Sequence, residues 1–317
     1  MSIAALVSTM SVQTYVSGAA LYQVRTCRAL CRKGSITQNG GVICKRYNKV
    51  EAYMLMIRCR LPERVSYDEG ALLEPLSVAI HTARKCRITK NSTCLILGAG
   101  AVGLLCAAVV KLQGCKMVVM TDIVADRLAF AKENGFADEI LINEPLKGVD
   151  IEDNLANSKA LADALIKLGH TTSNTVPGYD HVIECTGVEA CVRTSIYVSR
   201  RGNLVALLLT CWALQACRPS GDVLLVGMGT PIQNLPMSVI GSKEIKLTGI
   251  WRYADTYPEA LEIMAGMQAD TTLPDIRKLL THQFSGLDKA PDAFATAART
   301  QDESGRLIIK VVVRNGH

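Results

Sequence analysis

From residue 93 to residue 250, short apolar runs rich in β-branched residues alternate with longer segments whose apolar residues recur at i, i+3 and i+4. This alternation is typical of βαβ units around a parallel sheet. The pattern predicts strands at Thr93–Leu97, Met117–Thr121, Glu139–Ile142, His181–Cys185, Val223–Val226 and Ile245–Gly249. It predicts helices at Ala101–Leu112, Ala125–Asn134, Asn154–Leu168 and Glu189–Ser199. The expected fold class is therefore α/β, with a six-stranded, doubly wound parallel sheet.

The pattern changes on both sides of this region. After Trp251 we expect a helix, a strand, a helix and a strongly apolar strand, at Tyr257–Met267, Leu279–Phe284, Leu287–Ala298 and Leu307–Val313. This segment need not join the first sheet. Before residue 60 the sequence is weakly periodic and predicts no individual element.

Composition narrows the class of function. The chain has 317 residues, 49% of them hydrophobic and 20% charged, so it can bury a core. Its net charge of +6 is spread along the chain and aromatic residues make up only 5%, which gives no case for nucleic acid. The longest apolar run, 204–217, is shorter than the roughly 20 residues of a membrane-spanning helix. A small-molecule ligand fits this composition better.

Cysteine usage and the first residues bear on the compartment. The twelve cysteines include no CxxC pair, and several lie inside apolar runs, where a free thiol packs as a small hydrophobe. The first 24 residues are uncharged but lack the basic start of a signal peptide. We therefore expect a reducing compartment, the cytoplasm by default.

A glycine-rich turn carries the strongest chemical signal. Gly98, Gly100 and Gly103 form a GxGxxG pattern directly after a predicted strand and at the start of a predicted helix. These glycines allow the tight turn, the close approach of a pyrophosphate to backbone, and close packing of helix on strand. Asp122 ends the next strand about 20 residues further on, where a carboxylate accepts hydrogen bonds from the ribose hydroxyls and favours NAD over NADP.

Two alternatives stay open at this motif. Arg127 is placed to stack on the adenine or to neutralise a 2′-phosphate, which would weaken the preference for NAD. The turn can also belong to an α/β protein that binds no dinucleotide, in which case Asp122 caps the following helix.

Several further motifs match one family. They are the segments 61–66 (LPERVS) and 69–81 (EGALLEPLSVAIH), the GAGAVG turn, and the later segments 183–187 (IECTG), 225–229 (LVGMG), 250–258 (IWRYADTYP) and 280–284 (LTHQF). Over roughly residues 40 to 314 the chain resembles the zinc-dependent medium-chain dehydrogenases. Within them it is most similar to the polyol branch of sorbitol, xylitol and arabinitol dehydrogenases.

The resemblance implies roles for individual residues. It implies that the cofactor contacts Gly98, Gly100, Val102, Gly103, Asp122, Arg127, Val226, Gly227, Met228, Ile250, Trp251 and Arg252. It also implies that Arg252 and Tyr253 contact the substrate and that Glu74 lies at the catalytic zinc, holding the metal-bound water or the substrate oxygen. From residue type alone, Glu74 is better explained as a helix-start carboxylate, and Arg252 and Tyr253 are equally a polar strand end.

The resemblance also implies a domain division. Residues 1–60 would be a degenerate remnant of an amino-terminally truncated GroES-like catalytic domain, residues 61–256 the NAD-binding Rossmann domain, and residues 257–317 a return to the catalytic domain. Residues 203–220 form an apolar stretch that interrupts the family pattern. They are either a true insertion or an in-frame intron or similar gene-model error.

The zinc site of the family is incomplete in this sequence. The family holds its catalytic zinc with an amino-terminal cysteine, a Gly-His-Glu motif and the glutamate at position 74, but the first histidine of this chain is His81 and no Gly-His-Glu occurs. Three protein ligands are the usual minimum for catalytic zinc. Cys27, Cys31 and Cys44 are either metal ligands or free thiols.

Two functions therefore remain in view. The first is an NAD(H)-dependent polyol dehydrogenase that transfers a hydride between a secondary alcohol of a sugar alcohol and NAD+, giving a ketose. The second is a catalytically impaired NAD-binding paralogue. The expected partner is a small polyol or ketose, with no nucleic acid or membrane, and the family resemblance adds a homo-oligomer through the sheet edge.

Overall fold

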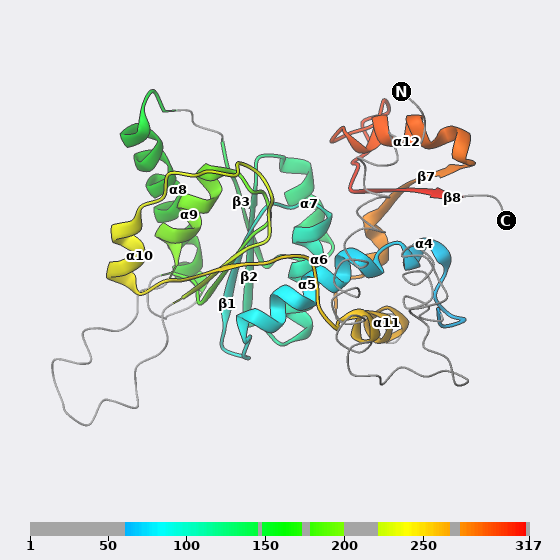
Figure 1. Cartoon of the computed structure of the whole chain (residues 1–317), viewed down its shortest axis with the longest axis horizontal. Coiled ribbons are helices and arrows are strands. Elements are labelled where there is room, and N and C mark those ends of the chain that lie inside the picture. The colour runs from blue at the N-terminus through cyan, green and yellow to red at the C-terminus, as the bar shows by residue number, and fades with distance from the viewer. Residues whose placement is uncertain (1–60, 145–147, 173–177, 200–220, 267–272, 315–317) are drawn as a thin grey trace, which may run out of the picture.

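A computed structural model describes residues 61–144, 148–172, 178–199, 221–266 and 273–314 of the chain. Its centre is a six-stranded, all-parallel sheet in the order β3-β2-β1-β4-β5-β6 (Figure 1). This order is that of the doubly wound Rossmann fold. Strands are added on one side of β1 as far as β3 and then on its other side from β4 onward, so the strand order reverses between β1 and β4. The α/β fold class expected from the sequence is confirmed.

The strands and helices of this unit follow the hydrophobic pattern closely. The strands are β1 (Thr93–Leu97), β2 (Met117–Asp122), β3 (Glu139–Ile142), β4 (His181–Glu184), β5 (Asp222–Leu225) and β6 (Lys246–Gly249). The helices are α4 (Tyr67–Gly70), α5 (Leu73–Cys86), α6 (Ala101–Leu112), α7 (Ala125–Glu133), α8 (Ile151–Thr172), α9 (Glu189–Val198) and α10 (Met237–Lys243). The differences are α8, which extends beyond the predicted Asn154–Leu168 at both ends, and α4, α5 and α10, which the pattern did not predict.

Both faces of the sheet are covered, which explains the continuous apolar character of its central strands. β1 is buried along its whole length, and β2 is buried except at Asp122. Helices α5, α6 and α7 contribute to the apolar core on one face, and α8, α9 and α10 pack on the other (Figure 1). No helix within the described ranges is long and apolar enough to span a bilayer.

The remaining described segments form a smaller unit beside the sheet, and its residues Ala260, Met264, Ile276 and Leu279 join the apolar core on the side of α5 and α6. It contains α11 (Tyr257–Gly266), η4 (Ile276–Leu279), β7 (Leu280–Ser285), η5 (Leu287–Lys289), α12 (Ala290–Ala297) and β8 (Lys310–Arg314). β7 and β8 pair in parallel as a separate two-stranded sheet, and α11 packs on α5. The expectation that this segment need not join the first sheet is confirmed.

Two predicted elements of this unit differ from the structure. The predicted helix Leu287–Ala298 is a short 3₁₀ turn followed by α12, whose Pro291 near the start lacks the N–H that a continuous helix would need. The predicted strand Leu307–Val313 begins only at Lys310, because Leu307 pairs with Gln301 and the N–H of Ile308 donates to Thr300.

A polar tether joins the two ends of the described chain. The carboxylate of Asp68, in α4, accepts hydrogen bonds from the Arg314 guanidinium and from Nε2 of Gln283 at 2.9 Å. The nearby guanidinium lowers the pKa of Asp68. This contact fixes β7 and β8 beside the start of α5, and thereby brings β8 to the edge of the central unit.

Some predictions concern residues outside the described ranges. They are the catalytic-domain remnant at 1–60, the cysteines Cys27, Cys31 and Cys44, and the insertion at 203–220. The domain boundaries near residues 60 and 256 stay predictions.

Candidate functional site

The glycine-rich turn connects β1 to α6 and has the geometry that its sequence predicts. Gly98 has φ +101°, a conformation that favours glycine, and its N–H donates to the Thr121 carbonyl at 2.8 Å. A Cβ at Gly103 would lie 1.9 Å from the Gly98 oxygen, so only glycine lets α6 approach the turn. Gly100 is the N-cap of α6, makes no side-chain cap hydrogen bond, and has nothing within 4 Å of the position that a Cβ would take. The first N–H groups of a helix have no acceptor within the helix, and the space beside Gly100 at this helix start is open.

Asp122 ends β2 directly beside this turn. Its carboxylate accepts hydrogen bonds from the backbone N–H of Ala99 at 2.6 Å and of Val124 at 2.9 Å. A carboxylate has about four acceptor positions, so further hydrogen bonds to a ligand remain available. Arg127 lies in α7, and its Nε is buried with no hydrogen-bond partner among the described residues.

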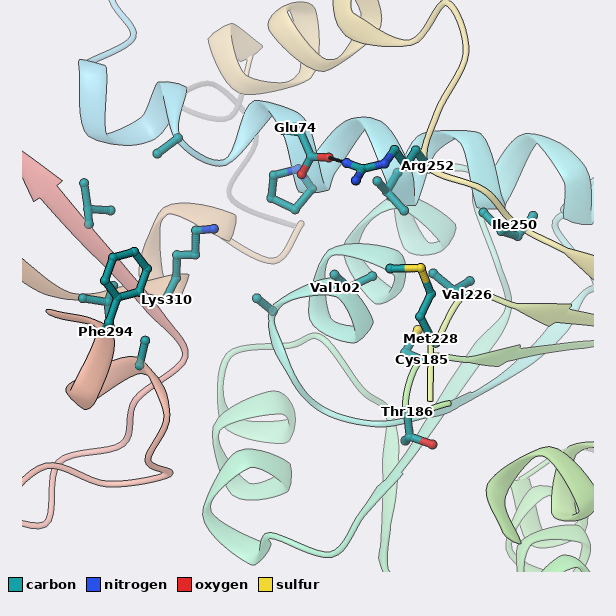
Figure 2. A pocket seen from close by; sticks show the side chains of 18 of the residues that line it. Glu74, Val102, Cys185, Thr186, Val226, Met228, Ile250, Arg252, Phe294 and Lys310 are labelled. Carbon is teal, nitrogen blue, oxygen red and sulfur yellow. Dashed lines mark ion pairs between the residues drawn. The ribbon is translucent and has the colours of Figure 1, made fainter. Parts of the chain in front are cut away.

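A cavity of about 790 Å³ opens at the carboxyl ends of β1, β4 and β5 (Figure 2). This is the crevice at which parallel sheets of this order bind ligands. One side consists of the start of α6 and the turns after β4 and β5, with Val102, Cys185 and Thr186 among the lining residues. The other side consists of α5, α12 and β8, so the two described units enclose the cavity together.

Three charged residues face the cavity from the second side. Glu74 in α5 and Arg252 after β6 form an ion pair with 3.9 Å between Oε1 and Nη1, and Lys310 reaches in from β8 (Figure 2). Burial raises the pKa of Glu74, and the nearby Arg252 and Lys310 partly offset this rise. Burial lowers the pKa of Lys310, and the Glu74 carboxylate opposes that shift. No ion pair within the described ranges includes Lys310.

The segment after β6 places three consecutive residues in different surroundings. Arg252 has φ +52°, so the chain turns there. Trp251 remains 69% exposed, with the Arg252 guanidinium 5.6 Å from its ring centre. Tyr253 is buried, with its ring centre 5.3 Å from that of Tyr257, and burial together with Glu74 raises its pKa to about 12.

The turns after β4 and β5 pack against one another through glycines. Gly187 has φ +72°, and a Cβ there would lie 2.2 Å from the Gly229 nitrogen. A Cβ at Gly227 would lie 2.0 Å from the Gly187 nitrogen. The two turns therefore meet backbone to backbone, and they form the part of the cavity lined by Thr186, Val226 and Gly227.

The structure brings many of the predicted site residues together. Those that line the cavity are Glu74, Val102, Val226, Gly227, Met228, Ile250 and Arg252. Gly98, Gly100, Gly103 and Asp122 shape the turn at its rim, whereas Arg127, Trp251 and Tyr253 are not among the lining residues. The roles assigned to these residues in binding and catalysis stay predictions.

Sequence reasoning missed Lys310, Phe294 and Thr186. Lys310 interrupts a run of six other aliphatic residues between Leu307 and Val313, and a charge inside such a run is a signal that could have found it. Thr186 lies within the 183–187 motif that carries the family resemblance, whereas nothing in the local sequence marks Phe294.

The described residues do not fit a zinc ion. No group of three or more His, Cys, Asp or Glu side chains within them is arranged to hold a metal. Among the lining residues only Glu74 and Cys185 carry such donors. Glu74 is paired with Arg252, and a hydrogen bond with Cys106, together with burial, raises the pKa of the Cys185 thiol well above its usual range. His81, on the same helix as Glu74, is not a lining residue.

The sheet order, the glycine turn and the cavity at the switch point define a Rossmann-type protein with a ligand crevice. Residues 101–208 match the model of the zinc-binding dehydrogenase family, and the chain is similar in sequence to sorbitol dehydrogenases.

The relatives show how much of the chain is shared. Sorbitol dehydrogenase of Gallus gallus is 31% identical over 259 residues, which cover 82% of this chain and 60% of the relative. Sorbitol dehydrogenase of Homo sapiens is 32% identical over 256 residues, which cover 81% of this chain and 59% of the relative. The chain thus spans about 60% of the length of these curated relatives.

Solved structures agree at the level of the fold. The crystal structure of L-idonate 5-dehydrogenase from Escherichia coli superposes with a TM-score of 0.57 at 23% identity, over 80% of this chain and 59% of that one.

Proposed function

We propose that this chain binds NAD(H) and carries the nucleotide half of a polyol dehydrogenase, which exchanges a hydride between a secondary alcohol and NAD+. The observation that carries the proposal is the glycine turn with Asp122 at the rim of a cavity that also holds the Glu74–Arg252 pair. The sorbitol dehydrogenase relatives support a sugar alcohol as the substrate class.

The described residues fit a dinucleotide. The free N–H groups at the start of α6 would bind the diphosphate, and the open space over Gly100 lets it approach the backbone. Asp122 would accept hydrogen bonds from the adenosine ribose. The nicotinamide would lie against the turns after β4 and β5, beside Thr186 and Val226. When bound, the nicotinamide supplies the hydride acceptor.

The charged side of the cavity would orient the substrate. The guanidinium of Arg252 offers a planar fork of donors that suits vicinal hydroxyl groups. Glu74, 3.9 Å from Arg252, offers a carboxylate that accepts a hydrogen bond from the reacting alcohol. Because burial raises its pKa, Glu74 exchanges a proton closer to neutral pH than an exposed glutamate does.

The second candidate is a catalytically impaired NAD-binding paralogue. The observation that favours it is the lack of a three-ligand metal group in the described part of the chain. The two candidates share the dinucleotide site and differ in chemistry, so they are separated by metal analysis and by polyol oxidation. Bound zinc with NADH formation from sorbitol or xylitol supports the enzyme, and NAD binding without either supports the paralogue.

The dinucleotide site is tested by calorimetric titration of the whole chain with NAD and with NADP. We expect wild type to prefer NAD, because the Asp122 carboxylate repels a 2′-phosphate. In Asp122→Asn the preference should fall by about tenfold, which corresponds to roughly 1.4 kcal/mol. A ratio of two affinities cancels any loss of stability in the variant. Absence of NAD binding to wild type would overturn the proposal, and an unchanged ratio would remove Asp122 from the site.

A further inference from the structure

Glu184 is a fully buried carboxylate that has no place in the mechanism above. It is the last residue of β4, its exposed fraction is 0%, and it is not among the cavity-lining residues. A buried charge is costly unless it is hydrogen-bonded, so its partners indicate what it does.

The carboxylate of Glu184 accepts hydrogen bonds from the two residues that follow Cys185. Its Oε1 accepts from the Thr186 N–H at 2.8 Å and from the Thr186 hydroxyl, and its Oε2 accepts from the Gly187 N–H at 2.9 Å. Burial raises the pKa of Glu184, and these donors act in the opposite direction by favouring the charged form. The side chain therefore folds forward and holds the turn after β4 in one conformation.

The backbone of the same residue holds the neighbouring turn. The Glu184 carbonyl accepts hydrogen bonds from the N–H groups of Val226 at 2.8 Å and of Gly227 at 2.9 Å. Gly187 in turn packs on Gly227 and Gly229 with no room for a Cβ. Both turns that shape one end of the cavity are thus anchored on one residue.

We infer that Glu184 is a positioning residue for the nicotinamide end of the cofactor, acting through the Thr186–Gly187 turn and the Val226–Gly227 turn that packs on it. This inference rests on the proposed dinucleotide binding. The adenosine end depends instead on the turn after β1 and on Asp122, whose hydrogen bonds go to Ala99 and Val124 and not to the turns that Glu184 holds.

The substitution Glu184→Gln tests the role with little change of volume. An amide has one acceptor oxygen and one NH₂ group where the carboxylate has two acceptors. Whichever way the amide is turned, its NH₂ faces the N–H of either Thr186 or Gly187, because both carboxylate oxygens accept from backbone N–H groups. This contact between two donors is unfavourable and loosens the turn, although an amide oxygen at the Oε1 position still lies 3.1 Å from the Gly187 nitrogen.

The measurement compares NAD with ADP-ribose, which lacks the nicotinamide. By calorimetry on the whole chain, we expect Glu184→Gln to lower the affinity for NAD by about tenfold, which corresponds to roughly 1.4 kcal/mol. The affinity for ADP-ribose should change by less than about twofold. The matched control is Asp180→Asn. Asp180 is a carboxylate that accepts from Thr93 at the opposite end of β1 and β4. Its substitution should leave the ratio of the two affinities unchanged.

Each outcome decides the inference. An equal loss of affinity for NAD and ADP-ribose, or no change in either affinity, would overturn the inference, since a purely structural role of Glu184 predicts one of these results. If Glu184→Gln fails to fold, Glu184→Asp keeps the charge, shortens the reach, and should shift the ratio in the same direction. Wild type that binds neither ligand would refute the proposed function itself, whereas wild type that binds both with an unaltered ratio in the variants would refute only the role of Glu184.

Discussion

The two sides of the cavity differ in what gives them their shape. On the side of the sheet, the turns after β1, β4 and β5 form a glycine wall, in which backbone lies against backbone at Gly98–Gly103, Gly187 and Gly227. On the side of α5 and β8, Glu74, Arg252 and Lys310 form a charged wall, in which long side chains meet across a gap of 3.9 Å or more.

This difference indicates how each side responds to change. Backbone contacts as close as those of the glycine wall leave no space for an added methyl group. The volume of a new side chain therefore decides which substitutions this wall tolerates. The charged wall consists of flexible side chains whose interactions with a ligand are electrostatic. The charge of a substituted side chain, and the pH, therefore decide how a substitution there changes ligand binding. We therefore expect substitutions at the closest backbone contacts of the glycine wall to cost stability, and substitutions in the charged wall to change ligand affinity or its pH dependence.

The largest effect should come from Gly103→Ala. The new Cβ would lie 1.9 Å from the Gly98 oxygen, and this oxygen belongs to backbone that cannot move aside alone. We expect the free energy of unfolding to fall by about 3 kcal/mol or more. Urea denaturation followed by circular dichroism measures this loss.

Gly100→Ala is the matched control in the same turn. Its φ of −76° suits alanine and nothing lies within 4 Å of its Cβ, so stability should stay within about 0.5 kcal/mol of wild type. NAD affinity should still fall by about tenfold, because the methyl group enters the space that the diphosphate would use. If Gly103→Ala and Gly100→Ala were equally stable, side-chain volume would not decide which substitutions the glycine wall tolerates.

The intermediate effect should come from Lys310→Met. Lys310 makes no ion pair with the described residues and lies across the cavity from Val102 (Figure 2). A ligand phosphate would therefore provide its counter-charge. We expect NAD to bind about tenfold more weakly, since a charge-assisted hydrogen bond contributes roughly 1.5 kcal/mol.

Adenosine, which carries no phosphate, should bind Lys310→Met as it binds wild type, and Lys310→Arg should keep most of the NAD affinity. Calorimetry at two salt concentrations measures both, because the contribution of the charge should shrink as salt screens it. Equal losses for adenosine and NAD would assign Lys310 a structural role instead.

The smallest effect should be the pH dependence caused by Glu74. Its folded pKa is raised above the ordinary value of 4.5, so its stabilising contribution is complete below that pH and is lost as pH rises through the folded pKa. Glu74→Gln carries no titrating group. Its melting temperature should match wild type near pH 4 and exceed it by about 2 °C or less at pH 7. If instead the melting temperature of wild type exceeded that of Glu74→Gln by more as pH rises, the ionised Glu74 would stabilise the fold, opposite to the expectation.

The glycine wall could be predicted from the sequence because its information is local. The turn of Gly98, Gly100 and Gly103 is encoded within six consecutive residues, between a strand and a helix that the hydrophobic pattern also predicts. The position of Asp122 follows because it ends the next strand in the sheet.

The charged wall was harder because it depends on packing between distant segments. Lys310 reaches the cavity from β8, and Arg314 of the same strand is bound by Asp68 near the start of the described chain. Tyr253 follows Arg252 in sequence, but the left-handed turn at Arg252 sends the two side chains to different places. Neither relation leaves a periodic or spacing signal.

The tether between Asp68 and Arg314 also sets an order of events during synthesis. Its partners are 246 residues apart, so the contact can form only after β8 has left the ribosome. The central sheet, whose strands end at Gly249, can assemble earlier. Until β8 is in place, the apolar lining at Val102 and Val226 lacks the cover that this strand gives it from across the cavity.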